Sequence, residues 1–130
     1  MGVQIITMST SKSIDPQGLQ KAKKSLPDEE VFSIVIKGFK ALADPTRAKI
    51  LYALHKQSLS VRDIASIAGI SESATSHQLT YLRERHLVQA KRDGVIMYYS
   101  ISYQHLHNLL QEAEEYADHV KNGHPDHPGR

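Results

Sequence analysis

The sequence predicts a mainly α fold with one two-stranded β-hairpin, an α+β arrangement in the order α-α-α-α-β-β-α. Apolar residues recur at helical spacing, about every 3.6 residues, through most of the chain. Helix start and stop signals cut this pattern into separate segments. Between residues 87 and 101 the period changes to two, as in a strand pair. With 130 residues, the chain is long enough for one domain.

The first third of the chain predicts an arm followed by two helices. Residues 1–27 are polar and lysine-bearing and are interrupted by Asp15-Pro16 and Gly18, so we expect a flexible N-terminal arm with one helical turn near residues 19–25. The first helix is expected over residues 28–43. Asp44 then serves as N-cap and Pro45 as first residue of the second helix, which runs to about His55. The apolar stripe of the first helix comprises Val31, Phe32, Val35, Ile36, Phe39 and Leu42.

Two further helices follow with very little chain between them. Ser60 to Asp63 forms a capping box that opens a third helix, which ends at Gly69. Ser71 caps a fourth helix that runs to about His86. A short helix, a glycine turn and a longer helix are typical of the helix-turn-helix. The residues expected to face the core are Ile50, Leu51, Leu54, Ile64, Ala65, Ala68, Ala74, Leu79 and Leu82.

A hairpin and a last helix complete the domain. Strands are expected over residues 87–92 and 95–101, joined by Asp93-Gly94 as a type I′ turn, with Lys91 and Arg92 at the tip. The last helix is expected over residues 103–122. The order of elements predicts a winged helix-turn-helix over residues 28–122, and we expect this domain to form a dimer through its terminal helices. We expect residues 123–130, rich in histidine and proline, to be a disordered tail.

Composition excludes several classes of protein. The formal net charge is only +2, so any nucleic-acid role must depend on a local basic patch. No cysteine, glycine-rich phosphate loop or His-Glu-x-x-His helix is present, and the acidic cluster at residues 112–115 lies on an outer helix face, so we expect no enzyme. No segment has the length and apolar composition of a membrane span or the pattern of a signal peptide. We therefore expect a cytoplasmic protein that does not associate with membranes.

The polar face of the fourth helix indicates binding to double-stranded DNA. Its first turns carry short or amide side chains that suit base edges in the major groove, and basic residues elsewhere could contact phosphates. Because one such helix makes few contacts, we expect a homodimer on a pseudo-palindromic operator, with half-sites about 10 bp apart. The alternatives are a solvated helix face in an all-α domain and a winged helix that binds protein. The expected base-reading residues are Ser71, Ser73, Thr75, Ser76, His77 and Gln78, with facing the third helix as the alternative for His77. Arg47 and Lys49 are expected to contact phosphates, and Lys91 and Arg92 to contact phosphate or the adjacent minor groove.

Three stretches resemble the ArsR/SmtB family of bacterial metal-responsive repressors: FKALADPTRAKILYAL, ISESATSHQLTYLRERHLV and AKRDGVIMYYSI. The resemblance covers about residues 28–120. It implies an obligate dimer that represses a resistance or efflux operon and releases DNA when it binds an inducer.

The resemblance also implies where an inducer would bind. The family's cysteine site, Cys-Val-Cys-Asp-Leu, reads Ser-Val-Arg-Asp-Ile at residues 60–64, so thiolate sensing of arsenite, lead or cadmium is not expected. The family's second site lies on the last helix. Its four positions correspond to Tyr103, His105, Tyr116 and His119, so two of the four ligands are retained.

His105 and His119 predict a site shared between subunits. They lie fourteen residues apart, or about 21 Å along one helix, so only antiparallel copies across a dimer bring them to one ion. Zinc, cobalt or nickel would suit such a site, with further ligands completing it. The alternative is a non-metal inducer or none. The candidate additional ligands are His107, Glu112, Glu115, His124 and His127, whereas His55 and His86 are expected to be ordinary surface or interface residues.

Overall fold

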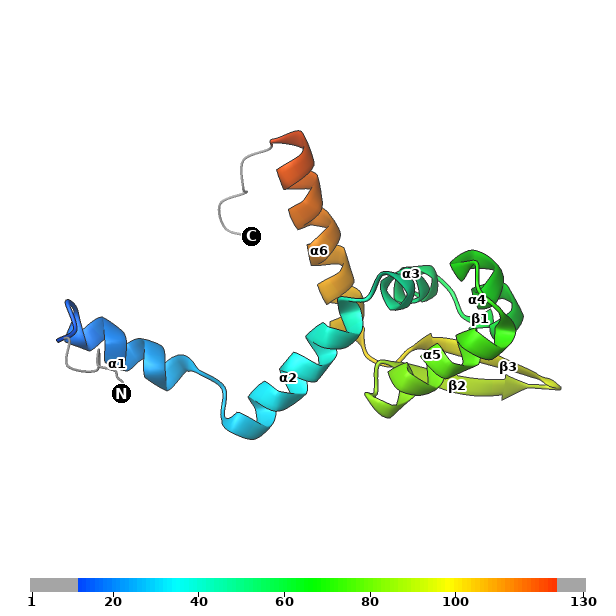
Figure 1. Cartoon of the computed structure of the whole chain (residues 1–130), viewed down its shortest axis with the longest axis horizontal. Coiled ribbons are helices and arrows are strands. Elements are labelled where there is room, and N and C mark those ends of the chain that lie inside the picture. The colour runs from blue at the N-terminus through cyan, green and yellow to red at the C-terminus, as the bar shows by residue number, and fades with distance from the viewer. Residues whose placement is uncertain (1–11, 124–130) are drawn as a thin grey trace, which may run out of the picture. The chain divides into compact units, whose positions relative to one another are not determined.

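The computed structural model describes residues 12–123, in which six helices and three short strands follow one another (Figure 1). The chain divides into two compact units, residues 1–34 and 35–130, and the boundary falls within the second helix. The helices are α1 (Pro16–Ser25), α2 (Glu29–Leu42), α3 (Pro45–Leu54), α4 (Val61–Ala68), α5 (Glu72–Glu84) and α6 (Gln104–Asn122). The strands are β1 (Leu59–Ser60), β2 (Val88–Asp93) and β3 (Ile96–Ile101).

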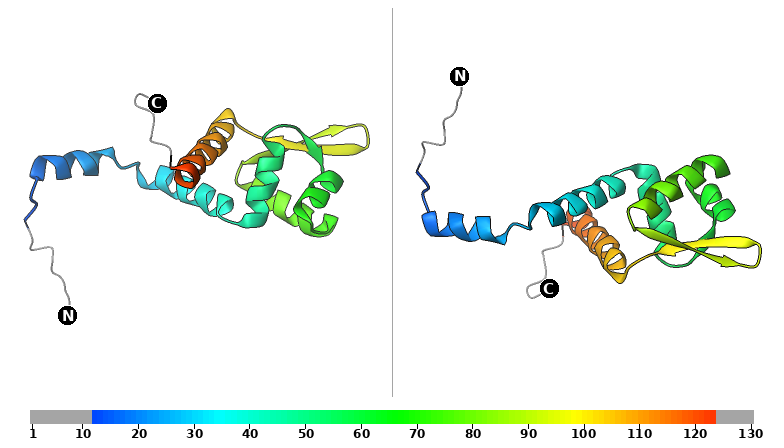
Figure 2. Two further views of the ribbon diagram at one scale, coloured as in Figure 1. Left: turned by 90° about the horizontal axis from the view of Figure 1, so that it is seen from above. Right: turned by 90° about the horizontal axis from the view of Figure 1, so that it is seen from below.

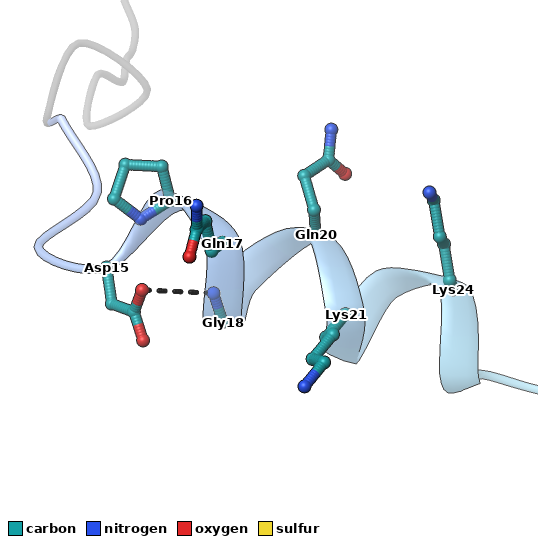
Figure 3. Close-up of a pocket in the computed structure, with 7 residues that line it drawn as sticks. All are labelled: Asp15, Pro16, Gln17, Gly18, Gln20, Lys21 and Lys24. Atoms are coloured by element: carbon teal, nitrogen blue, oxygen red, sulfur yellow. Dashed lines mark hydrogen bonds between the residues drawn. The ribbon is translucent and has the colours of Figure 1, made fainter.

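Helix α1 is longer than the single turn that the sequence predicted. The Asp15 carboxylate accepts a hydrogen bond of 3.0 Å from the Gly18 N–H, and Pro16 is the first helical residue (Figure 3). Asp-Pro was interpreted as an interruption, but here it acts as the same N-cap and N1 pair that opens α3. None of the residues of α1 is buried.

The expected second helix start is confirmed, and the end of α2 is tied to it. The Asp44 carboxylate accepts a hydrogen bond from the Arg47 N–H at 2.9 Å. The Arg47 Nε donates to the carbonyl of Ala41 at 3.0 Å, at the last turn of α2. One arginine therefore satisfies a terminal carbonyl that helix geometry leaves without an intrahelical partner.

A third strand, which the sequence did not predict, joins the hairpin. Strand β1 pairs with β3 through Leu59 opposite Tyr99 and Ser60 opposite Tyr98, giving an antiparallel sheet in the order β1-β3-β2. Two residues are too few to show an alternating pattern. In Figure 2, α3, α4 and α5 lie together beside this sheet.

The hairpin turn lies one residue later than predicted. Asp93 pairs with Ile96, so the two turn residues are Gly94 and Val95. Gly94 has a φ of +66°, whereas Val95 does not have a positive φ. A type I′ turn needs positive φ at both positions, which a β-branched residue resists, whereas a type II′ turn needs it only at the first. The expected I′ turn at Asp93-Gly94 is therefore wrong.

The core forms where α3–α6 meet the sheet. Of the residues predicted to face inward, Ile50, Leu51, Leu54, Ile64, Ala65, Leu79 and Leu82 are buried, whereas Ala68 and Ala74 are half-buried. The apolar stripe of α2 behaves differently: Val31, Phe32, Val35 and Phe39 are exposed in the single chain.

Candidate functional site

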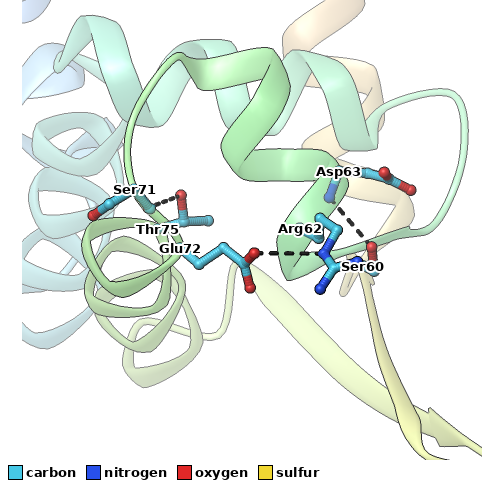
Figure 4. A network of polar contacts seen from close by, with 6 residues as sticks. All are labelled: Ser60, Arg62, Asp63, Ser71, Glu72 and Thr75. Carbon is cyan, nitrogen blue, oxygen red and sulfur yellow. Dashed lines mark hydrogen bonds and ion pairs between the residues drawn. The ribbon is translucent and has the colours of Figure 1, made fainter.

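A tight turn between α4 and α5 sets the position of α5. Gly69 adopts the left-handed conformation, with φ of +72°, and its N–H donates to the carbonyl of Ala65 at 2.8 Å. The Ser71 Oγ then accepts a hydrogen bond from the Ala74 N–H at 3.0 Å and caps α5. An exposed ion pair between Arg62 and Glu72, at 3.5 Å, also joins the two helices (Figure 4). Exposed pairs contribute little, so the glycine and the cap hold the turn.

The outer face of α5 presents most of the residues predicted to contact bases. Ser73, Ser76 and His77 are exposed, and Gln78 is half-buried. Ser76 and His77 line a hollow on the surface together with Thr80 and Tyr81, which the sequence analysis did not select. The first turns of α5 therefore offer hydroxyl, imidazole and amide groups to a groove.

Thr75 is a correction to the predicted DNA-binding set. Its side chain is fully buried, and its Oγ1 donates to the carbonyl of Ser71 at 2.8 Å (Figure 4). It lies on the inward stripe with Leu79 and Leu82, four and seven residues further along the helix. A threonine hydroxyl that donates to a carbonyl of its own helix can be buried without leaving a donor unpaired. The polarity of Thr75 therefore gave the wrong prediction, because it placed the residue on the outer face of α5.

Arg47 was predicted to contact phosphate, but its guanidinium makes contacts within the protein. Besides the carbonyl of Ala41, it bonds that of Lys40 at 3.3 Å, and it lies 4.1 Å from the ring centroid of Tyr81. Arg85 covers the same ring at 3.5 Å. The spacing of Tyr81 and Arg85 on one helix is visible in the sequence. No sequence signal connects Arg47 to Tyr81. Arg47 therefore positions α5 on α3.

The other predicted phosphate contacts are accessible. Lys49 is exposed on α3, and Lys91 and Arg92 are exposed on β2. Lys91 and Arg92 lie inside the strand, opposite Tyr98 and Met97, rather than at the tip. They line a hollow on the sheet that also includes Gln89, Tyr98 and Ser100.

The two predicted metal ligands stay apart within one chain. His105 is exposed near the start of α6 and His119 is half-buried near its end, on a helix that runs without interruption from Gln104 to Asn122. Tyr103 and Tyr116, at the family's other two ligand positions, are both exposed. Within residues 12–123, no group of three or more histidine or acidic side chains is placed to hold a metal ion.

The additional candidate ligands are divided among different environments. Glu112 is exposed, and Glu115 accepts a hydrogen bond from Gln111 at 3.2 Å. His107 contacts His55, at the end of α3. His124 and His127 lie outside the described residues.

A histidine pair that the sequence analysis missed joins α3 to α6. The Nδ1 atoms of His55 and His107 lie 2.8 Å apart, and the two half-buried rings have centroids 5.0 Å apart. His55 was expected to be an ordinary surface or interface residue, so its part in this contact is new. Residues 52 positions apart on two helices carry no spacing signal.

Tyr52 strengthens the same contact between helices. Its hydroxyl donates to the carbonyl of Leu110 on α6 at 2.8 Å, and its ring meets that of His55 edge-on. Burial raises the pKa of Tyr52 above the ordinary value of 10.0, and the negative charge of Glu114 raises it further. The phenol therefore stays protonated and able to donate throughout the neutral range.

Helix α6 leaves large apolar side chains exposed. Leu106 and Leu110 are buried, but Leu109 is 40% exposed, Val120 68% and Tyr116 72%. An apolar stripe that continues past the core on an otherwise polar helix indicates a surface for association.

Comparisons with known proteins show which family of regulators the chain resembles in sequence. The sequence pattern of the arsR family of bacterial regulatory proteins matches residues 44–90. A transcriptional repressor SmtB homolog from Synechocystis is 46% identical over 83 residues, which span 64% of this chain and 61% of that protein. A cadmium resistance transcriptional regulatory protein, a CadC homolog from Staphylococcus aureus, is 34% identical and matches 73% of this chain and 78% of its own length.

The fold is also found among solved structures. A homodimeric winged helix-turn-helix DNA-binding domain from Mycobacterium bovis superposes with a TM-score of 0.70 at 28% identity, covering 79% of this chain and 97% of that one.

A helix-turn-helix with an exposed polar face, beside a basic hairpin, defines a winged helix-turn-helix regulator of the DNA-binding class. The chain belongs to the arsR family of bacterial regulatory proteins. Family and fold are those of transcription regulators and not of enzymes, as the sequence analysis expected. In the part of the chain that the structure describes, no helix has the length and apolar composition of a membrane span.

Proposed function

We propose that this protein is a homodimeric repressor that binds a pseudo-palindromic operator in the cytoplasm and releases it when a divalent metal ion binds to α6. The observation that carries the DNA part is the combination of exposed Ser73, Ser76 and His77 on α5 with exposed Lys91 and Arg92 on β2. Side chains on α5 would read base edges in the major groove, and those on the hairpin would contact the phosphate backbone.

The exposed apolar residues of α6 support the dimer. Leu109 and Val120 are exposed to water in the single chain. Burying them against a second copy would stabilise the dimer by about 25 cal/mol for each Å² of apolar surface removed from water. The M. bovis domain with the same fold is a homodimer. A second copy would present its own α5 to the next turn of the duplex.

DNA binding is tested by fluorescence anisotropy on a duplex selected from random sequences. Ser76→Ala should weaken binding to the selected duplex about tenfold and relax the preference at one base pair. Lys91→Gln should weaken binding to all duplexes and reduce the salt slope by about one. Lys121→Gln, which removes the same charge near the end of α6, is the matched control. Equal effects of the Lys91 and Lys121 variants would refute the assigned hairpin contact.

The metal part depends on His105 and His119. These imidazoles suit zinc, cobalt and nickel, and one helix separates them by about 21 Å, so both reach one ion only across two antiparallel helices. A relative named for cadmium resistance is consistent with a metal inducer. Metal bridging two α6 helices would favour a dimer in which the two α5 helices no longer fit their half-sites.

Operator affinity should therefore be measured with added zinc, cobalt and nickel. At least one ion should weaken binding, and His105→Ala with His119→Ala should abolish that effect while leaving metal-free binding unchanged. His86→Asn, at an exposed histidine outside α6, is the control, because asparagine tolerates the positive φ of 61° at this position. No change of affinity with any of the three ions would remove the metal from the proposal.

A second candidate function retains DNA binding with a non-metal inducer or none. Exposed Tyr103 and Tyr116 stand where the resemblance expects ligands, and phenols are poor zinc ligands at neutral pH. This candidate predicts normal regulation in cells by the His105→Ala/His119→Ala protein.

A further inference from the structure

The imidazoles of His55 and His107 face each other across the contact between α3 and α6. Their Nδ1 atoms are 2.8 Å apart, so a ring nitrogen at the end of α3 lies in hydrogen-bond contact with one on α6. In the metal-free protein one Nδ1–H donates to the lone pair of the other, since two protonated or two unprotonated Nδ1 atoms would repel. Each nitrogen lone pair is also a ligand for a borderline divalent metal ion.

The separation is close to that of neighbouring ligands on one ion. For metal–nitrogen bonds of about 2.1 Å, two ligands at a right angle lie about 3.0 Å apart, and two at the tetrahedral angle about 3.4 Å apart. For octahedral geometry the two nitrogens would thus need to separate by only about 0.2 Å. Because the ring centroids lie 5.0 Å apart, the two lone pairs point nearly at each other, so the His107 ring must also turn before both nitrogens face the ion. Ions that accept this geometry include nickel and cobalt, and copper forms the tightest imidazole complexes.

The surroundings hold one ring in place and leave room for water. The Tyr52 ring meets the His55 ring edge-on at 6.4 Å, and its hydroxyl is anchored to Leu110. Such outer contacts orient a ligating imidazole. Both histidines are half-buried, so solvent reaches the pair and can supply the remaining ligands.

We propose that His55 and His107 form a metal site within one protomer, which takes a divalent ion of the nickel, cobalt or copper class together with water. This site is separate from the one proposed across the dimer, because it uses neither His105 nor His119. An ion here would clamp α6 onto the C-terminal end of α3. Near its other end, α3 contacts Tyr81 of α5 through Arg47, so the clamp would fix α6 relative to the DNA-reading helix.

The test uses nickel chloride and the full chain carrying His105→Ala, His119→Ala, His124→Asn and His127→Asn. Equilibrium dialysis of this background protein should give one bound nickel per protomer. Adding His55→Asn should weaken binding at least tenfold, and His107→Asn, from the other helix, should do the same. His86→Asn is the matched control and should leave binding unchanged. Circular dichroism checks that each variant is folded.

A second readout needs no substitution at the pair itself. In the background protein, substoichiometric nickel should broaden the ring NMR signals of His55 and His107 before that of His86. The proposal is overturned if the background protein binds no nickel, or if these two ring signals stay sharp at one equivalent. Loss of operator release in the His105→Ala/His119→Ala protein bears on the site across the dimer alone, so the two proposals fail separately.

Discussion

Tyr81 lies between two guanidinium groups, with Arg47 at 4.1 Å and Arg85 at 3.5 Å from its ring centroid. Contacts of this kind are stabilising by about 0.5–2 kcal/mol and fix the angle at which two helices meet. Here they join α3 to the helix that would enter the groove. At the scale of single residues, Arg47 therefore has a structural role, although its charge alone assigned it to DNA.

Thr75→Val tests the burial of a residue that polarity would place on the outer face. Removing the hydroxyl leaves the carbonyl of Ser71 with one hydrogen bond fewer, so the free energy of unfolding should fall by about 1 kcal/mol. Operator preference should not change. Ser76→Ala should do the reverse, with unchanged denaturant unfolding and weaker operator binding. A loss of base preference in the Thr75→Val protein would contradict the buried position.

Tyr52→Phe tests the contact between α3 and α6. Losing the hydrogen bond to Leu110 should lower the free energy of unfolding by about 1 kcal/mol at neutral pH. Because the folded-state pKa of Tyr52 is raised, its contribution is complete below the ordinary value of 10.0 and is lost as pH rises through the raised pKa. The difference between wild type and variant should therefore narrow in strong alkali.

Urea unfolding of both proteins, at neutral pH and above about pH 10, measures this difference. Tyr103→Phe removes a hydroxyl from a 60% exposed ring that is not part of the apolar surface of α6, and it should change nothing. A difference that widens with pH would show that the phenol is not the group responsible.

At the scale of elements, the sequence predicted what local chemistry determines. Asp44 and Ser71 start their helices as expected, because an N-cap acts within three residues. Strand β1 was not predicted, because its two residues form a strand only through pairing with β3. The hairpin turn lies one residue later than predicted because the pairing of β2 with β3 sets the register. This pairing outweighs the local preference of Asp93-Gly94 for the two turn positions.

Gly94→Ala tests the turn. At φ of +66°, alanine should cost about 1 kcal/mol relative to glycine, and since nothing lies within 4 Å of an added Cβ, the cost is conformational alone. Gly94→Asn should cost less, because asparagine tolerates this conformation. Thermal unfolding of the three proteins should give the order glycine, asparagine, alanine. Equal stability of the asparagine and alanine proteins would contradict the left-handed conformation at this position.

At the scale of the whole molecule, the single chain is incomplete in two respects. Leu109 and Val120 remain exposed on α6, and His105 and His119 are too far apart to share an ion. Leu106, Leu109, Leu110 and Val120 recur at helical spacing in the sequence, and of these Leu106 and Leu110 enter the core. Which part of a stripe faces the core and which part remains outside depends on the tertiary fold, so the sequence alone could not divide them.

The central claim is that two copies place their α5 helices in successive major grooves of one duplex. Its most direct test is the affinity of the protein for palindromic duplexes that differ only in the distance between half-sites. Affinity should be highest when the half-site centres lie about one helical turn, or 10 bp, apart, and should fall at least tenfold when 5 bp are inserted. Equal affinity at all distances, or for an isolated half-site, would contradict it.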